Sequence, residues 1–333
     1  MAIDDESLSN QPRQAEPGIP DATPPRARLL PEEEYIEQAY FFRTFGERLE
    51  DNRPAQDILR TVGEEILATT KLPIAIDLLA SEVERRGLIA PAMQKLGHYF
   101  TPFQTFVIEQ AEDDRSRFPF RTALEVLQRE VEYRAGLHEQ TDRRGRNRTA
   151  TVLPAGLFTY QFEAIARNRL GYTTGLEAMA ADPIYFQVDP ILGVNLGPWW
   201  RAWLLELPRR IGTVDFADLV YDRSEQFVID QRRISRNDAF EPLRPSLFGQ
   251  QEGRIAKANS GRDPLYMFAA MQRQLGYPKV PRVERKNREA ELDPAIELRF
   301  QRLEAKLLML ENEQKGTLDL SEFMDKNGFA FDD

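Results

Sequence analysis

Apolar residues recur at steps of three and four along most of the chain, which is the spacing of one face of an α-helix. The first such run aligns Tyr35, Phe42 and Phe45. Similar runs follow near residues 54–70, 73–87, 102–112, 119–137 and 153–170. Alternating strand patterns are almost absent. The chain is therefore predicted to be all-α, an irregular bundle of about a dozen helices.

Proline and capping residues mark where many of these helices should begin. Pro31, Pro54 and Pro73 stand at the start of apolar runs, where a missing backbone donor costs nothing. Residues 101–104 and 174–177 match the capping-box pattern.

Aspartate supplies a second set of predicted caps. Asp-Pro pairs stand at residues 182, 189, 263 and 293, and aspartate followed by proline is typical of a helix start. A further helix is predicted to open at Asp222, with Glu225 as its capping-box partner. The alternative for the Asp-Pro pairs is a set of catalytic aspartates.

Residues 183–211 contain all three tryptophans of the chain, Trp199, Trp200 and Trp203. Burying a large apolar side chain contributes about 1.5–3 kcal/mol, so this segment is predicted to anchor the core. Prolines and polar residues interrupt it too often for a membrane-spanning helix. The alternative is an amphipathic helix seated at a membrane surface.

The pattern divides the chain into five parts. Residues 1–30 hold five prolines and few large apolar residues, and are predicted to be a disordered acidic leader. A helical body is predicted over 31–275, with a candidate sub-boundary near 138–152. A charged linker (276–292), an amphipathic heptad helix (293–315) and an acidic tail (316–333) are predicted to follow.

The heptad helix has the most regular apolar pattern in the chain. Its seam consists of Ile296, Phe300, Leu303, Leu307 and Leu310, at spacings of four, three, four and three. An isolated helix of this length is marginal in water, so the seam must be buried. We expect it to bind a protein partner or a second copy of the chain. The alternative is docking onto the chain's own body.

Charge is unevenly distributed. Of the net charge of −10, residues 1–37 contribute nine acids against three arginines, and residues 311–333 contribute seven acids against two lysines. One basic cluster stands out: Arg143, Arg144, Arg146 and Arg148. Such a cluster can contact phosphate, nucleic acid or an anionic membrane. The alternatives are a solvated loop and an intramolecular contact with an acidic tail.

A second candidate site for anions lies in a predicted loop. Residues 237–262 are rich in glycine and proline, which is typical of a loop. The stretch 249–263 adds Arg254, Lys257 and Arg262, and long polar loops are frequent positions for ligand sites.

Composition excludes several kinds of chemistry. The chain has no cysteine, which excludes disulfides, thiol nucleophiles and thiolate-bound metals. His98 and His138, the only histidines, lack the spacing of di-iron or zinc motifs. Neighbouring acids at 112–114 could offer only hard oxygen ligands. No metal or cofactor is predicted.

These observations favour a helical interaction or scaffold protein that acts through its C-terminal amphipathic helix, and an enzyme is the less favoured class. The N-terminus is acidic and lacks an apolar run, so the cytoplasm is the expected location. One alternative is an enzyme or small-anion-binding protein that uses carboxylates and arginines. A further alternative is a peripheral membrane or nucleic-acid binder that uses the arginine-rich loop.

Overall fold

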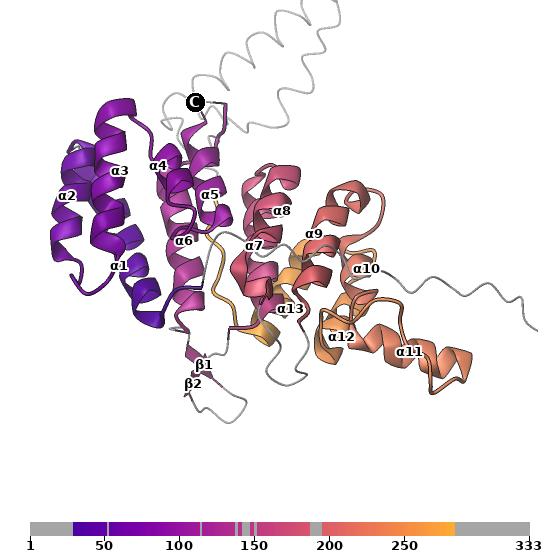
Figure 1. The fold of residues 1–333 in the computed structure, drawn as a ribbon. Helices are drawn as coiled ribbons and strands as arrows, with labels where there is room; N and C mark the ends of the chain where they lie inside the picture. The colour runs from indigo at the N-terminus through magenta and orange to yellow at the C-terminus, as the bar shows by residue number, and fades with distance from the viewer. Residues whose placement is uncertain are drawn as a thin grey trace, which may run out of the picture. The chain divides into compact units, whose positions relative to one another are not determined.

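The computed structural model describes residues 29–51, 53–113, 115–136, 139–141, 147–149, 152–186 and 195–283. Over these ranges the regular secondary structure is helical apart from one short hairpin, which confirms the predicted all-α class (Figure 1). The α-helices are α1 (Glu32–Arg48), α2 (Ala55–Glu65), α3 (Leu72–Arg86), α4 (Ala90–Lys95), α5 (Pro102–Glu112), α6 (Phe120–Arg134), α7 (Pro154–Asn168), α8 (Tyr172–Ala180), α9 (Gly197–Arg210), α10 (Phe216–Tyr221), α11 (Glu225–Ser235), α12 (Gln250–Ala258) and α13 (Pro264–Leu275).

Two short 3₁₀-helices and one hairpin complete the described structure. The 3₁₀-helices are η1 (Leu49–Asp51) and η2 (Pro183–Phe186). The strands β1 (Glu139–Thr141) and β2 (Asn147–Thr149) pair antiparallel between α6 and α7. Because α6 and α7 also pack against each other, the body continues across the candidate sub-boundary near 138–152.

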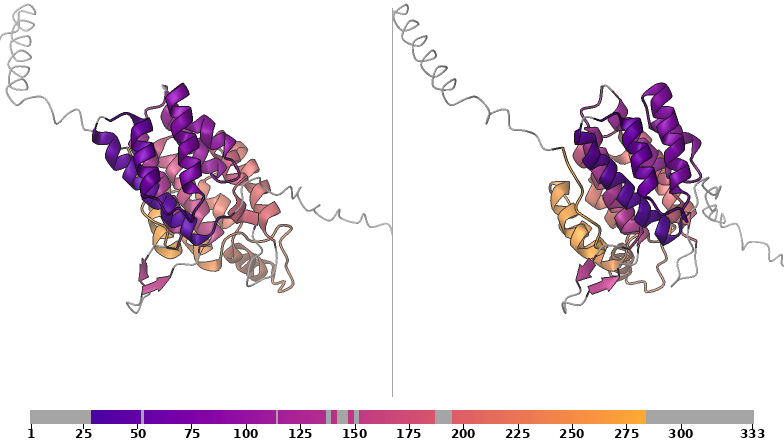
Figure 2. Two further views of the ribbon diagram at one scale, coloured as in Figure 1. Left: turned by 60° about the vertical axis from the view of Figure 1, so that its left-hand side comes forward. Right: turned by 90° about the vertical axis from the view of Figure 1, so that its left-hand side faces the viewer.

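The helices form two groups that meet at α7 and where α5 contacts α8. In the first group α1 packs along α6, α2 packs along α3, and α5 contacts α6. Figure 2 shows this group, coloured indigo to purple, from two further sides. In the second group α9 packs on α8, and α12 contacts α10, α11 and α13. The helix α7 contacts α6, α8 and α13, so it joins the two groups.

Local side-chain bonds start or end several helices as predicted. The Thr101 hydroxyl accepts a hydrogen bond from the backbone N–H of Gln104 (3.3 Å), and the Gln104 side chain accepts one from the backbone of Thr101 (3.0 Å). Asp263 caps α13 by accepting from the N–H of Leu265 (2.9 Å). Gly87 ends α3 with a φ of 72°, a conformation that glycine adopts without strain.

Two other predicted caps are wrong. Thr174 lies inside α8, and its hydroxyl donates to the carbonyl of Gly171 (3.4 Å). The helix α11 starts after Ser224, not after Asp222. Ser224 is buried, and the neighbouring Glu225 N–H donates to the carbonyl of Phe248 (3.0 Å). The Ser224 hydroxyl also accepts from the N–H of Phe227 (3.3 Å), so a local cap and packing against this distant segment together set the start of α11.

The predicted tryptophan anchor is part of an aromatic core around Phe158 of α7. Trp200 and Trp203 are buried, with ring centroids 5.6 Å and 5.0 Å from that of Phe158. Phe248 lies 5.7 Å from the same ring. The ring of Phe162 stacks on those of Phe158 and Phe216 and extends the cluster. Aromatic pairs at these separations contribute beyond their buried area, so α7 is held from several sides.

The body extends further toward the C-terminus than the sequence predicts. Tyr277 is buried, and its hydroxyl donates to Glu163 (2.7 Å) on α7. Val280 is also buried, and the Asn168 side chain bonds the backbone at Pro281 (3.0 Å). Residues 276–283, which the sequence assigns to the linker, therefore belong to the body.

Several predicted features lie outside the described residues. These are most of the leader (1–28), the remainder of the linker, the heptad helix (293–315), the acidic tail (316–333), the Asp-Pro pairs at 189 and 293, and Arg143, Arg144, Arg146 and His138.

The aromatic core leads to a prediction for stability. Replacing Phe158 by alanine removes the ring that contacts both tryptophans, and we expect a loss of about 3–5 kcal/mol in the free energy of unfolding. Urea titration followed by tryptophan fluorescence measures it. Leu265→Ala, at an exposed position of α13, is the matched control and should change stability by less than about 0.5 kcal/mol. Equal effects of the two substitutions would contradict this account of the core.

Candidate functional site

The most unusual feature of the interior is a buried cluster of three charged residues. Arg134 on α6 donates to Glu130 one turn earlier (2.8 Å) and to both carboxylate oxygens of Asp182, with one of these bonds at 3.2 Å. The three side chains are at most 1% exposed. An isolated buried charge is costly, so the partners must be retained together.

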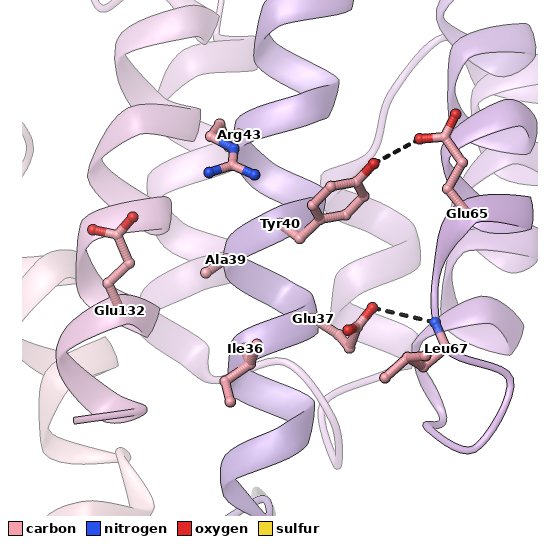
Figure 3. Close-up of a pocket in the computed structure, with 8 residues that line it drawn as sticks. All are labelled: Ile36, Glu37, Ala39, Tyr40, Arg43, Glu65, Leu67 and Glu132. Carbon is pink, nitrogen blue, oxygen red and sulfur yellow. Dashed lines mark hydrogen bonds between the residues drawn. The ribbon is translucent and has the colours of Figure 1, made fainter. Parts of the chain in front are cut away.

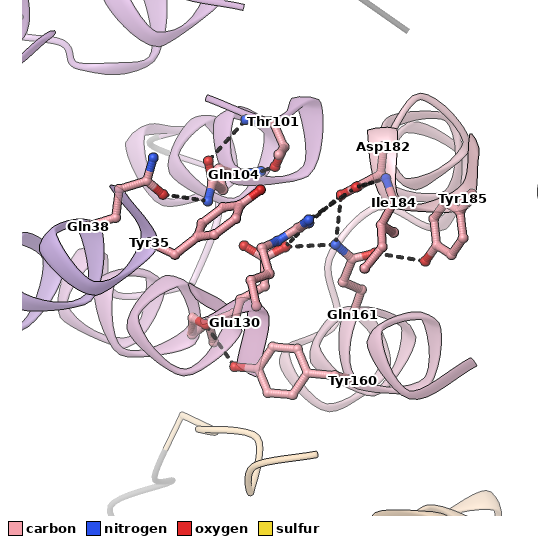
Figure 4. Close-up of polar contacts among 12 residues, drawn as sticks. Tyr35, Gln38, Thr101, Gln104, Glu130, Tyr160, Gln161, Asp182, Ile184 and Tyr185 are labelled. Atoms are coloured by element: carbon pink, nitrogen blue, oxygen red, sulfur yellow. Dashed lines mark hydrogen bonds and ion pairs between the residues drawn. The ribbon is translucent and has the colours of Figure 1, made fainter. Parts of the chain in front are cut away.

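Neutral side chains complete the cluster (Figure 4). The Gln161 side chain on α7 donates to Glu130 (2.7 Å) and accepts from the Tyr185 hydroxyl (3.2 Å). The Asp182 carboxylate also accepts from the backbone of Ile184 (3.1 Å), at the start of η2. The cluster therefore joins α6, α7 and the turn into η2.

A second buried polar chain runs from α1 to α5. Gln104 donates to Gln38 (3.3 Å), and the Tyr99 hydroxyl donates to Glu34 (2.7 Å). The same Glu34 carboxylate accepts from the backbone of Lys71 (2.9 Å). Burial, together with the bond to Glu34, raises the pKa of Tyr99. These contacts fix α1 against α5 and the turn before α3.

The charged cluster contains two carboxyl groups and one guanidinium. Burial raises the pKa of Glu130, and Asp182 acts in the same direction. Burial alone disfavours the guanidinium charge, but Asp182 and Glu130 together raise the pKa of Arg134 well above its usual value. A proton on Glu130 leaves one carboxylate opposite one guanidinium, which is the arrangement that a low-dielectric interior favours.

The sequence reasoning missed this cluster. Asp182 does start η2 through the bond to Ile184, close to its predicted capping role, but it also binds a guanidinium 48 residues away. The signal that could have indicated part of the cluster is the spacing of Glu130 and Arg134, four residues apart on one helix face. Because the cluster is closed to solvent, its role is to hold the fold.

A cleft of about 490 Å³ lies on the surface beside α1 (Figure 3). This volume is in the range of ligand pockets, which is about 300–1,000 Å³. Its lining consists of Ile36, Glu37, Ala39, Tyr40, Arg43, Glu65, Leu67 and Glu132. Figure 3 shows Ile36 and Ala39 on α1 between Glu132 on one side and Glu37 on the other.

Most polar groups of this α1 cleft are held in place. The Tyr40 hydroxyl donates to Glu65 (2.7 Å), which also pairs with Arg48 (2.7 Å), and both contacts lower the pKa of Glu65. Glu37 accepts from the backbone of Leu67 (3.2 Å). The Arg43 guanidinium lies 5.6 Å from the Tyr40 ring. The exposed apolar side chains are Ile36 and Leu67, at 37% and 57% exposure.

A second, more apolar cleft of about 400 Å³ lies between α7, α10 and α13. Its walls include the rings of Phe162, Tyr172, Phe216 and Phe268. Asp215 is the only charged residue on its lining, and both of its carboxylate oxygens accept backbone hydrogen bonds. The lining therefore offers few polar groups for recognition.

The predicted anion-binding loop at 249–263 is largely a helix, so this prediction of a loop is wrong. Residues 250–258 form α12, which packs against α10, α11 and α13. Arg254 donates to Gln226 (3.0 Å), and Lys257 pairs with Asp230 (2.7 Å). Arg262 is exposed beyond the helix. The glycines that indicated a loop allow close packing instead, since Gly253 leaves no room for a methyl group beside Ser224.

The remaining candidates are dispersed. Arg148 lies in β2, with Gln140 as its partner across the hairpin. His98 is exposed, and Glu112 accepts from the backbone of Ile89 and Ala90 at the start of α4 (2.5 and 3.0 Å). No group of three or more histidine, aspartate or glutamate side chains with metal-binding geometry occurs among the described residues. No helix of this part of the chain is long and apolar enough to cross a bilayer.

The buried cluster predicts a pH-dependent difference between the wild type and Glu130→Gln. Because burial raises the folded-state pKa of Glu130, folding retains a proton that the unfolded chain releases near pH 4.5. The contribution of Glu130 to stability is therefore full below this pH and is lost as the pH rises through the folded-state value. We expect the glutamine variant to gain on the wild type by about 1.4 kcal/mol per unit of pKa difference.

Urea titrations from pH 4 to pH 8 measure this difference. Glu125→Gln, at an exposed position of the same helix, is the matched control and should follow the wild type at every pH. A constant or opposite difference for Glu130→Gln would show that Glu130 is ionised in the folded protein.

Comparison with known proteins gives no relative for this chain. No protein-family model matches it, no curated protein matches it, and no solved structure matches its fold.

Proposed function

We propose that this chain is a helical interaction protein whose body binds a partner segment in the α1 cleft. The observation that carries the proposal is the combination of exposed Ile36 and Leu67 with carboxylates on the same lining. Exposed apolar surface that is surrounded by polar groups is typical of an interaction site. Most other apolar residues of the described body are buried in one contiguous core.

The cleft favours a partner with a bulky apolar side chain next to a basic one. Ile36, Ala39 and Leu67 supply the apolar contact surface. Three carboxylates stand on the lining against the single guanidinium of Arg43. Glu37 uses one oxygen for the backbone of Leu67, which leaves the other free to accept from a lysine or arginine of the partner.

The C-terminal seam is the second contact of the proposed scaffold. It rests on the heptad spacing of Ile296, Phe300, Leu303, Leu307 and Leu310. A scaffold needs at least two binding surfaces, and the cleft and the seam lie in different parts of the sequence. The seam is proposed to pair with a second copy or with a helix of a partner.

The two alternative functions have weaker support. For small-anion binding, Arg254 and Lys257 are already bonded to side chains of α11, so only Arg262 of this group is free of described partners. For nucleic-acid or membrane binding, the support is the sequence clustering of Arg143, Arg144, Arg146 and Arg148. We therefore place both below the interaction function.

A selection experiment tests the cleft. Random peptides displayed on phage and selected on the full chain should be enriched in sequences that join a large apolar residue to lysine or arginine. Binding of these peptides should weaken at least about tenfold on Ile36→Ala/Leu67→Ala and on Glu37→Lys/Glu132→Lys, because each pair removes one half of the recognition. Leu265→Ala is the control. Enriched peptides that bind all variants equally would exclude the cleft as the site.

Sedimentation of the full chain tests the seam. Replacing Leu303 and Leu307 by glutamate puts charge at the centre of the heptad pattern, and we expect a smaller sedimenting species than for the wild type. Ala305→Glu, on the opposite side of the same predicted helix, should sediment as the wild type does. A wild type that already sediments as a monomer, or identical masses in all three, would contradict self-association through the seam.

A further inference from the structure

Residues 227–246 form an excursion from the body, which we call the arm. It contains most of α11 and the segment that returns from it (Figure 1). Its base is closed by backbone bonds: Glu225 donates to the carbonyl of Phe248 (3.0 Å), and Leu247 donates to that of Arg223 (2.8 Å). The ends of the arm are therefore fixed, and its shape is a property of the fold.

None of the residues of the arm is buried. Its first half touches the body through Phe227, whose ring is 5.7 Å from that of Tyr221, and through the pair of Asp230 and Lys257. Arg244 on the returning side donates to Glu206 (2.8 Å). No apolar side chain of the arm packs against the hydrophobic core.

The tip of the arm, residues 231–243, is held only by its own bonds within the described structure. Arg232 donates to the carbonyl of Phe240 (2.9 Å), and the N–H of Asn237 donates to the carbonyl of Arg232 (3.2 Å). A helix of 11 residues is marginal in water without packing. The arm is thus ordered in a position where it gains little from burial.

The tip also exposes large aliphatic side chains. Ile234 is 75% exposed and Leu243 is 77% exposed, and Ile229 on the same helix is exposed as well. Covering side chains of this size stabilises a contact, because it removes apolar surface from water. The apolar groups are therefore available to stabilise a contact with another molecule.

The charges of the tip indicate which kind of molecular surface would fit it. Arg233 and Arg236, at the C-terminal end of α11, are exposed and form no ion pair with any described residue. The same is true of Asp238 and Glu241 in the returning segment. Each copy thus offers a basic stretch followed directly by an acidic stretch, so the arm is complementary in charge to itself.

We propose that the arm is the interface between two copies of this chain, related by a two-fold axis. In a two-fold interface the same patch is used twice, so the basic stretch of one arm meets the acidic stretch of the other in both directions. Ile234 and Leu243 of the two arms lie in the centre of this contact, with the ion pairs around them. The proposal is independent of the α1 cleft and of the C-terminal seam.

Charge reversal tests the two-fold pairing. In Arg233→Glu/Arg236→Glu all exposed charges of the tip are acidic, and in Asp238→Arg/Glu241→Arg they are all basic, so each protein repels itself. We expect the dimer dissociation constant of each to rise at least about tenfold over the wild type, and the equimolar mixture to form heterodimers. Light scattering gives the masses. A mixture that stays monomeric, or single variants that dimerise like the wild type, would overturn the proposal.

The same measurements are made on the full chain carrying Leu303→Glu and Leu307→Glu, so that the seam does not contribute to the mass. In this background Ile234→Glu/Leu243→Glu should be monomeric, and Ile74→Glu, at an exposed position of α3, should dimerise like its parent. The parent is measured over a 100-fold range of concentration up to its solubility limit. If it is monomeric throughout, the arm proposal is overturned, and the seam and cleft proposals are untouched. Circular dichroism confirms that every variant keeps its helix content.

Discussion

The buried guanidinium of Arg134 is the constraint on which the rest of the structure depends. It is closed from solvent and bound by Glu130 on its own helix and by Asp182 beyond α8. A charge in this position is stable only while its partners stay in place, because removal of one partner leaves an uncompensated charge in a medium of low dielectric. The cluster therefore fixes the register of α6 against α7 and the turn into η2, and with it the way the two groups of helices meet.

The aromatic core lies on the other side of the same junction. Phe158 and Gln161 both belong to α7. Phe158 contacts tryptophans of α9, and Gln161 joins the charged cluster. Non-directional burial supplies most of the stabilisation, whereas the hydrogen bonds specify which residues face one another. Tyr277 adds a third contact to this helix from the end of the body. One helix is thus held by burial, by charge and by a distant segment.

The surface of the body has two contrasting features. In the α1 cleft the polar groups are already bonded, and apolar side chains lie among them, so recognition would add contacts to a preformed site. At the tip of the arm, Arg233, Arg236, Asp238 and Glu241 form no ion pair with described residues, and Ile234 and Leu243 are exposed. The cleft therefore suits a short segment of a partner, and the arm suits a surface that matches it in both charge and shape. The junction at α7 affects the cleft and the arm only indirectly, because it holds together the body that carries them.

Local spacing along the chain was enough to predict the helical class and the ends of those helices that are set by near neighbours. The Thr101 box, the Asp263 cap and the glycine after α3 all involve residues within four positions of one another, so their pattern is visible in the chain. Only the three-dimensional packing fixed the pairing of Arg134 with Asp182, the helix that replaces the expected anion-binding loop, and the burial of residues after Leu275. Each of these depends on groups far apart along the chain, and local spacing carries no information about which distant residue will supply the partner.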